Sequence, residues 1–457
     1  MNGVIIWFRR DLRLHDNPAL IWAAQQGHPI IALYIDSAEE EGEWVTGAAS
    51  RWWLQQSLDT LSQQLAEEGI RLHFFQGRAA DVLLQVVRET AIMNVGCTRL
   101  SEPHLQARDR KSKEQLAEAG VTLHIFDEWH LLQPDSLLNQ QGKPYKVFTP
   151  FWKRLRRELT GFPVAETGSQ STPHFLKPSP RQPSGGGSLA ELALCDLHPW
   201  QQKLAVHWQP GERFAWQRLE LFLGGMLGDY PVSRDRPAVD GISMLSPHLH
   251  FGEITARQIL RELMPLLDHS ATSAAAEAWL RQLGWAEFAR YVLWHFPYTT
   301  DQPMDPRFGN NFWQMDEVKF TAWKKGETGV AIIDAGMRQL WQSGWMHNRV
   351  RMLVASFLTK NLGLPWQAGA SWFWETLVDA DLANNSMGWQ WVAGCGVDAS
   401  PYFRIFNPET QAQRFDQEGA YCRHWLGDEY GQPRRQPLVD LKRSREQALE
   451  RYQSRVR

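Results

Sequence analysis

Four short apolar segments, separated by stretches of helical periodicity, fill the first 130 residues of the chain. They span residues 4–8, 29–35, 70–75 and 121–126, and residues 49–68 are the clearest of the Ala-, Leu- and Gln-rich stretches between them. Uninterrupted apolar runs of this length are typical of strands that are buried on both faces of a parallel sheet. We therefore predict an α/β domain with a Rossmann-like parallel sheet over residues 1–130.

Two phosphate-binding motifs are absent from this region of the sequence. Neither GxGxxG nor GxxxxGK[ST] follows any of the four segments. A dinucleotide-binding Rossmann site or a P-loop would therefore lack its phosphate cradle here. The α/β fold by itself does not identify a ligand.

The composition changes twice after the α/β domain. Residues 160–190 are rich in Pro, Gly and Ser, so we predict an interdomain linker over 131–204, in which the glycines at 185–187 are flexible chain rather than a phosphate loop. From residue 205 the strand signals stop and helical periodicity takes over, with a break at Ser343 and Gly344 between two helices. We predict a larger, all-α domain over 205–457.

Composition and charge exclude several classes of protein. A chain of 457 residues with 43% hydrophobic residues is a folded protein of two or three domains. Its net charge of −3 neither supports nor excludes DNA binding, which would need cations gathered on one face. The four cysteines form no CxxC pair, so we expect reduced thiols and no zinc finger. With no signal peptide or run of eighteen apolar residues, we expect a cytoplasmic protein without a membrane span.

Polar residues recur at helical spacing in three places in the helical half. The three groups are Trp279, Gln282, Trp285, Ala286 and Ala289; Asn348, Arg351, Met352 and Ala355; and Asn385, Gly388, Trp389 and Val392. Residues three and four apart share one face of a helix. These mixed faces predict the lining of a cavity for a flat, polar, partly aromatic ligand. The alternative is that each polar residue is solvated or caps a helix.

Other polar residues keep two interpretations open. Asp379 and Asp381 are either helix caps or acceptors for a bound group or for Arg351, while His347 and His424 suit satisfied histidines. No GxSxG or HExxH motif occurs, and the fifteen histidines show no spacing of metal ligands. We expect no metal site, and any difficult chemistry would belong to a bound cofactor.

Three long motifs resemble one protein family. Residues 240–255 (DGISMLSPHLHFGEIT), 326–362 and 379–408 (DADLANNSMGWQWVAGCGVDASPYFRIFNP) resemble the photolyase/cryptochrome flavoproteins, specifically bacterial photolyases that act on cyclobutane pyrimidine dimers. The N-terminal VIIWFRRDLRLHDNPAL matches the first strand and loop of the same family. The resemblance extends over nearly the whole chain.

The resemblance implies that the helical domain binds FAD, folded into a U. Ser243 and Ser246 can donate to phosphate oxygens. Met244 replaces the Arg that is common in the family, so a phosphate contact could come from Arg351 instead. The full set of residues that the resemblance assigns to FAD is Tyr230, Ile242, Ser243, Met244, Leu245, Ser246, Trp279, Gln282, Trp345, Asn348, Arg351, Asp379, Asp381 and Asn385.

The resemblance also assigns catalytic roles. Asn385 matches the Asn that faces the reactive central-ring nitrogen of the flavin; plant cryptochromes carry Asp there, which favours repair over signalling. Trp389, Trp366 and Trp313 match an electron path from the flavin to the surface, although three packing tryptophans remain the alternative. The implied reaction is light-driven and redox-neutral. An electron from photoexcited reduced FAD opens the cyclobutane ring of the dimer and then returns.

UV-damaged DNA is the implied substrate, with the damaged dinucleotide flipped out of the duplex. The residues assigned to DNA are Arg234, Trp285, Asn348, Met352, Trp391 and Gln411. Gln282 is a departure, because most photolyases of this kind carry a Glu that hydrogen-bonds the dimer. Six-four photolyases also carry Gln there, but their mechanism needs a His where this chain has Met352. A six-four photolyase is therefore an alternative that Met352 disfavours.

The second chromophore and the partners are less constrained. Relatives hold an antenna chromophore in the N-terminal domain. Methenyltetrahydrofolate is the first expectation and a deazaflavin the second, although LSEPHLQARDRK lacks the Asn-Glu pair of folate-binding relatives. We expect a monomer with no obligate protein partner. A cryptochrome-type photoreceptor and a flavoprotein electron-transfer module are the competing functions, disfavoured by Asn385 and by the tryptophan series respectively.

Overall fold

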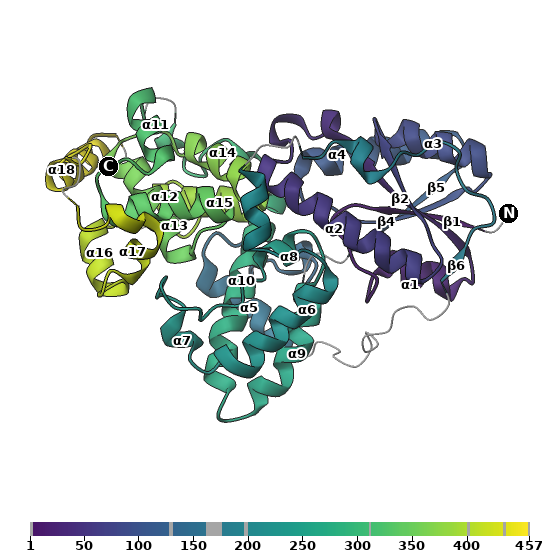
Figure 1. The fold of residues 1–457 in the computed structure, drawn as a ribbon, viewed down its shortest axis with the longest axis horizontal. Coiled ribbons are helices and arrows are strands. Elements are labelled where there is room, and N and C mark those ends of the chain that lie inside the picture. Colours follow the sequence, from purple (N-terminus) through teal and green to yellow (C-terminus); the bar gives the residue numbers. More distant parts are fainter. Residues whose placement is uncertain are drawn as a thin grey trace.

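The computed structural model describes residues 3–127, 131–160, 176–195, 200–309, 312–399, 403–432 and 436–455. Figure 1 shows an open sheet with its covering helices at one end of an elongated molecule and a helical part at the other, with the chain termini at opposite ends. The two classes of structure predicted for the two halves are confirmed. All named strands of the described residues lie before residue 179.

The sheet has a doubly wound topology. Its strands follow the order β3-β2-β1-β4-β5, all parallel, and the short β6 adds to β2. The bounds are β1 Val4–Phe8, β2 Pro29–Asp36, β3 Leu72–Gln76, β4 Asn94–Thr98, β5 Thr122–Phe126 and β6 Lys177–Pro178. The four predicted strands are confirmed. Strand β4, beside β1 in the sheet, was not predicted. Four of its five residues are Asn, Gly, Cys and Thr, so it does not form an apolar run.

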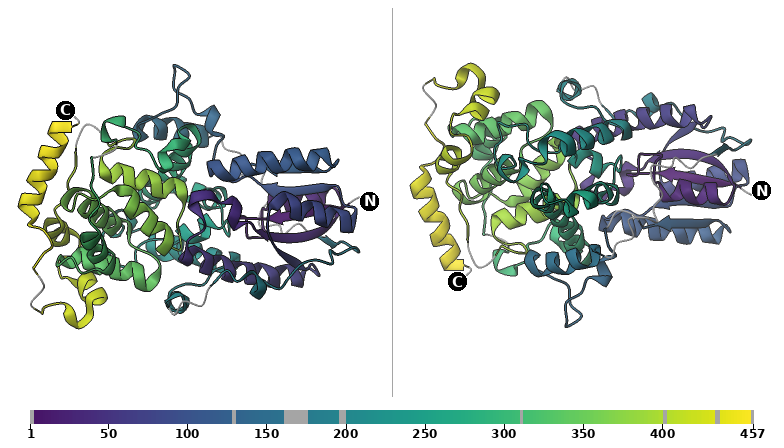
Figure 2. Two further views of the ribbon diagram at one scale, coloured as in Figure 1. Left: turned by 90° about the horizontal axis from the view of Figure 1, so that it is seen from above. Right: turned by 90° about the horizontal axis from the view of Figure 1, so that it is seen from below.

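Alternate residues of the central strands pack into two different layers. Ile6 of β1 belongs to a core with α1 and α2, whereas Ile5 and Trp7 belong to a second core with α3 and α4. Figure 2 shows helices on both sides of the sheet. Burial on both faces explains why β1 and β2 are almost uninterrupted apolar runs. The bounds of these helices are α1 Pro18–Gln25, α2 Ala48–Glu67, α3 Ala79–Thr90 and α4 Pro103–Glu118.

The helical part is built from α5 to α18. The bounds are α5 Phe148–Leu159, α6 Glu212–Leu221, α7 Tyr230–Ser233, α8 Ser246–His250, α9 Ala256–Asp268, α10 Ser273–His295, α11 Glu317–Lys325, α12 Ala331–Ser343, α13 Asn348–Ser356, α14 Trp366–Thr376, α15 Leu382–Ala393, α16 Pro408–Phe415, α17 Ala420–Leu426 and α18 Leu441–Arg455. The predicted break at Ser343 is confirmed, because Gly344 ends α12 in the left-handed conformation.

The predicted linker over 131–204 is wrong for its first part. Helix α5 lies there and buries Phe148, Phe151, Trp152 and Leu155 in the core that it shares with α10. These apolar residues recur every three or four positions, which is a helical signal that the sequence analysis overlooked. Residues 177–178 then pair with β2 at the sheet. Residues 161–175 and 196–199 of the predicted linker lie outside the described residues.

The segment after β1 joins the sheet to the helical part. The amide of Leu12 donates to the carbonyl of Phe251 (3.1 Å), and Nη1 of Arg13 donates to the carbonyl of Gly252 (3.0 Å). Glu212, at the start of α6, accepts from the amides of Leu14 and His15. These backbone and side-chain hydrogen bonds fix the segment after β1 against the residues that follow α8 and against the start of α6.

Cysteines, metal-binding clusters and membrane-spanning helices bear on the class of protein. Cys97 and Cys395 are buried free thiols, as expected. Within the described ranges, no cluster of His, Cys, Asp and Glu side chains has the makings of a metal site. None of the described helices combines the length and apolar character that crossing a bilayer requires.

Candidate functional site

Asp379 is the centre of a polar cluster that joins three segments far apart in sequence. The hydroxyl of Ser246 donates to Oδ2 of Asp379 (2.6 Å), and Nη2 of Arg351 donates to both carboxylate oxygens (3.0 and 2.8 Å). The indole N–H of Trp345 points at the Ser246 hydroxyl (3.3 Å). The start of α8, the first turn of α13 with the residues before it, and the segment before α15 therefore meet at one place.

Arg351 is engaged within the protein. Besides its bonds to Asp379, its Nε donates to the carbonyl of Met346 (2.7 Å), and its guanidinium lies over the ring of Trp345. Of the two interpretations of Asp379, the structure bears out the acceptor for Arg351. A phosphate at this place would have to share the Arg351 guanidinium with Asp379.

The segment before α8 has an unusual backbone that Arg218 holds in place. Met244 has a φ of 54°, in the left-handed region that residues with side chains rarely adopt. Arg218 donates to the carbonyls of Ile242 (3.1 Å) and Ser243 (3.0 Å). Leu245 and Tyr230 anchor the segment in the core. Backbone held in a rare conformation by its surroundings is typical of ligand-binding segments.

Helix α15 begins at a capping aspartate and has open space beside Gly388. Asp381 caps the helix by accepting from the amide of Asn384 (2.8 Å), so its interpretation as a cap is confirmed. Nδ2 of Asn385 donates to the carbonyl of Ala370 on α14 (3.0 Å). A methyl group built on Gly388 would meet no atom within 4 Å. Open space therefore lies beside the helix, one turn from Asn385.

Helix α10 carries the next polar group. Oε1 of Gln282 accepts from Nη2 of Arg234 (3.0 Å), so these two predicted residues contact each other. Trp285, one turn further along, stacks on Phe148 of α5 with ring centroids 3.6 Å apart and an interplanar angle of 11°. Trp279 lies buried against Phe222. One face of Trp285 is thus packed, and the ring remains only half-buried.

Two of the three predicted path tryptophans are fully enclosed. Trp366 and Trp389 have exposed fractions of 0% and 3%, and neither indole N–H has a hydrogen-bond partner among the described residues. A methyl group on Gly369 would lie 2.1 Å from the Trp389 ring, so this glycine makes room for it. Trp313 is half-buried and donates to the carbonyl of Thr359 (3.0 Å). The three rings belong to one packed cluster that runs from the interior outward.

Four further residues that were predicted to bind DNA lie on α13, α15 and α16. Asn348 is exposed at the first residue of α13, and Met352 is half-buried one turn later. Trp391 is half-buried with the guanidinium of Arg404 over its ring at 5.3 Å. Gln411 lies half-buried on α16, which packs against α12. Arg404 was not predicted, because no periodic pattern surrounds it.

His347 is a site residue whose importance sequence reasoning missed. Its Nδ1 accepts from the amide of Arg349 (3.2 Å), which caps α13, but its Nε2 has no partner among the described residues although only 3% of the side chain is exposed. Burial, together with Arg349, Arg351 and Arg234, lowers the pKa of His347 to about 4, against the opposing effect of Asp235. The prediction of a satisfied histidine holds for one ring nitrogen only.

The lowered pKa of His347 predicts a pH-dependent stability. Above pH 6.5 both the folded and the unfolded state keep this imidazole neutral; as the pH falls from 6.5 toward 4, only the unfolded state takes up the proton, so stability is lost. The full loss is about 3 kcal/mol. In urea unfolding, His347→Asn, which keeps the cap, should flatten this dependence, whereas exchange of the exposed His269 should not. An unchanged slope in His347→Asn would contradict the assignment.

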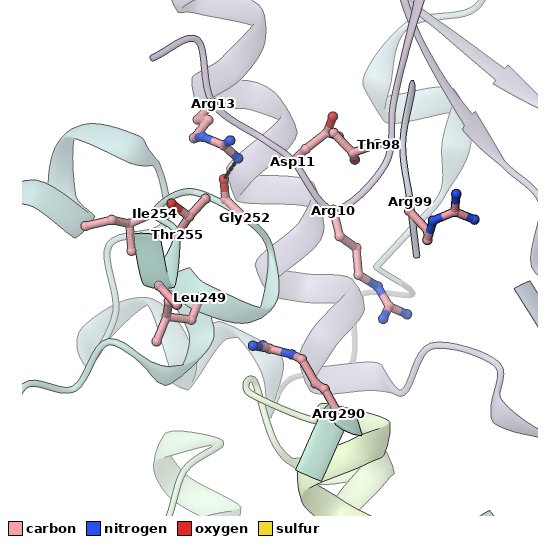
Figure 3. A pocket seen from close by; sticks show the side chains of 11 residues that line it. Arg10, Asp11, Arg13, Thr98, Arg99, Leu249, Gly252, Ile254, Thr255 and Arg290 are labelled. Atoms are coloured by element: carbon pink, nitrogen blue, oxygen red, sulfur yellow. Dashed lines mark hydrogen bonds between the residues drawn. The ribbon is translucent and has the colours of Figure 1, made fainter. Parts of the chain in front are cut away.

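A second site lies where the sheet meets the helical part. The pocket in Figure 3 is lined by residues that follow β1 (Arg10, Asp11, Arg13), residues at the end of β4 (Thr98, Arg99), the turn between α8 and α9, and Arg290. The strand order reverses between β1 and β4, and ligands of open α/β sheets bind outside the carboxyl ends of strands at such a point. Two of the four arginines of this pocket are already paired, Arg10 with Glu102 and Arg99 with Asp127, and Arg13 donates to backbone carbonyls.

Comparisons with known proteins agree with this geometry. Residues 279–435 match the FAD binding domain of DNA photolyase, and residues 4–173 match DNA photolyase. A deoxyribodipyrimidine photo-lyase of Agrobacterium fabrum is 38% identical over 98% of this chain and 97% of its own. Cryptochrome-2 of Arabidopsis thaliana is 36% identical over 92% of this chain and 70% of its own. The crystal structure of a bacterial class III photolyase from Agrobacterium tumefaciens superimposes with a TM-score of 0.92 at 37% identity, over 99% of this chain and 98% of the other.

Proposed function

Since the chain belongs to the photolyase/cryptochrome family, we propose that it repairs cyclobutane pyrimidine dimers in UV-damaged DNA under blue light. The support is the identity to a deoxyribodipyrimidine photo-lyase over nearly the full length of both chains. The polar cluster around Asp379 and the neighbouring groups on α10 would then form one catalytic site.

The residues around Asp379 fit FAD. The segment before α8 ends at the exposed Ser246, whose hydroxyl would donate to a phosphate in place of Asp379, and the open space beside Gly388 can take a flat ring. The buried N–H groups of His347 and Trp391 have no partner among the described residues and are potential donors. Buried polar groups without partners are costly, so a bound polar ligand would stabilise them.

FAD would supply the electron that opens the dimer, and the protein supplies position. In this proposal, Asn385 lies at the flavin and is held by its bond to Ala370. Gln282 presents an amide to the flipped dimer in an orientation that Arg234 fixes, and the exposed face of Trp285 receives the two linked bases of the lesion by stacking. Trp389, Trp366 and Trp313 would carry an electron inward when the flavin needs reduction. No side chain acts as a nucleophile.

The observation that carries the proposal is the direct packing of α10 on α15. Ala289 and Leu293 of α10 pack against Ala383 and Met387 of α15. Gln282 and Trp285 lie one to two helical turns before Ala289 on α10, and Asn385 lies between Ala383 and Met387 on α15. A lesion held by α10 would lie beside a flavin held by α15, which is the arrangement that direct electron transfer between them requires.

Two other activities remain as alternatives to this proposal. A blue-light photoreceptor is favoured by the identity to Cryptochrome-2, which extends over 92% of this chain. A six-four photolyase would need a second histidine, where the structure has the half-buried Met352. An electron-transfer module is favoured by the parallel sheet of the first domain alone.

A repair assay separates these functions. The full chain, loaded with FAD and fully reduced, should restore thymine-dimer DNA in blue light but not in the dark, and should leave six-four DNA unchanged. Gln282→Glu should keep the activity because a carboxylate still accepts from Arg234, whereas Gln282→Leu should lower it about tenfold through the lost hydrogen bond. Absence of light-dependent repair of either lesion, with flavin bound, would favour the photoreceptor.

The pocket of Figure 3 is our proposed site for an antenna chromophore, because it lies at the carboxyl ends of β1 and β4, where the strand order reverses. Methenyltetrahydrofolate is the first expectation and a deazaflavin the second. Absorption spectra of pigment released from the purified protein would identify it. We further propose a cytoplasmic monomer, which gel filtration on and off DNA would test.

A further inference from the structure

A cluster of aromatic rings surrounds Trp313 and reaches the C-terminal helix α18. Trp313 contacts Phe312 (4.7 Å between ring centroids) and lies nearly parallel to Phe308 (6.0 Å, 23°). Phe308 in turn contacts Phe403 (6.4 Å) and Tyr452 of α18 (6.1 Å). Two successive ring contacts therefore connect Trp313 with Tyr452.

The ring of Tyr452 is held firmly in this cluster. It stacks on Phe403 with centroids 4.3 Å apart and an angle of 12°, while Nζ of the buried Lys360 lies 3.1 Å from the centroid of the same Phe403 ring. One face of a ring cannot hold both groups at these distances, so Lys360 and Tyr452 lie on opposite faces of Phe403. This sandwich fixes the position of Tyr452 relative to Phe308 and Trp313.

Tyr452 differs chemically from its aromatic neighbours. Phenylalanine is not oxidised by a tryptophan radical, whereas a phenol is, provided that it can release its proton. Tyr452 is half-buried, so solvent can reach it and take up its proton. In this cluster, as the structure describes it, Tyr452 is thus the group suited to donate an electron to oxidised Trp313.

We propose that Tyr452 is the terminal electron donor of the tryptophan path, an inference that rests on the proposed flavin site and on the path from Trp389 to Trp313. One electron passes from Tyr452 to the Trp313 cation radical, which becomes neutral tryptophan. The phenolic O–H bond breaks, its proton goes to water, and a neutral tyrosyl radical remains. An external thiol later returns one hydrogen atom to that radical.

The test is flash photolysis of the full chain loaded with oxidised FAD. In the unaltered protein, the tryptophan-radical absorption should decay into a tyrosyl radical, which electron paramagnetic resonance of flash-frozen samples also detects. Tyr452→Phe keeps the ring stack and removes the O–H group. It should lose the tyrosyl signal and return the tryptophan radical to the ground state by recombination. Tyr430→Phe, which changes another tyrosine packed on the same helical core, is the matched control and should behave like the unaltered protein.

The outcomes distinguish this inference from the function on which it rests. A tryptophan radical that decays identically in Tyr452→Phe and in the unaltered protein, with no tyrosyl signal, overturns the role of Tyr452 and leaves the tryptophan path intact. Absence of any tryptophan radical in the unaltered protein removes the path itself. Loss of the tyrosyl signal in Tyr430→Phe as well as in Tyr452→Phe would also overturn the assignment.

Discussion

Light should no longer reduce oxidised FAD in the Trp389→Phe variant. Trp389 lies one helical turn from Asn385 and is enclosed by Phe373 and Trp323, so no solvent molecule can replace it as an electron donor at this place. A phenyl ring fills most of the same space but is not oxidised in its stead. Repair by protein that has been reduced chemically beforehand should continue, because the repair step does not use the path. Steady-state absorption of the flavin under blue light measures the first effect.

Trp7→Phe is the control for this experiment. Trp7 is buried to the same degree, and its indole N–H also has no partner within the described structure, but it lies in β1 of the sheet. It should lose stability to a similar extent and keep normal photoreduction. If Trp389→Phe is photoreduced at the normal rate, the assignment of Trp389 as the first donor is wrong.

Gly252→Ala should destabilise the protein by about 3–5 kcal/mol. Gly252 has a φ of 66°, and a methyl group on it would lie 2.1 Å from the carbonyl oxygen of Arg10 and 2.8 Å from the Cα of Asp11. Both obstacles are backbone atoms in the contact between the sheet and the helical part, so they cannot move aside cheaply. The cost combines the left-handed conformation, about 1–2 kcal/mol, with the overpacking. The change in the urea midpoint of unfolding measures it.

Gly27→Ala is the matched control for Gly252→Ala. Gly27 has nearly the same φ, 64°, but a methyl group on it would meet nothing within 4 Å. It should lose only the conformational part, about 1–2 kcal/mol. Equal losses in the two variants would show that the contact between Gly252 and Arg10 does not contribute.

Local patterns predicted much of the fold, and their failures have identifiable causes. The uninterrupted apolar runs of β1 and β2 were recognisable because these strands are buried on both faces. Strand β4 was not, since a central strand can be built from small and polar residues when its neighbours supply the packing. Helix α5 carries a clear helical pattern. It was included in the predicted linker because the residues that follow it are rich in Pro and Gly.

The candidate site shows the same division. Spacing on single helices correctly grouped Gln282 with Trp285 and Asn385 with Trp389, since residues three or four apart share a helix face. It left open what Asp379 binds. The structure answered that with Arg351 and Ser246, the latter 133 positions away. In the structure, Gln411 lies half-buried on α16 and Asn348 is exposed at the start of α13.

The sequence by itself determined the two structural classes, the polar helix faces and the family to which they belong, because all three depend on short-range periodicity and on motifs that are continuous along the chain. Only the tertiary structure decided that Arg234 donates to Gln282 and that Tyr452 contacts the ring cluster of Trp313. The same holds for the buried Nε2 of His347, which has no hydrogen-bond partner among the described residues. Those contacts join residues from distant segments. They depend on how whole helices pack, which no local pattern of residues specifies.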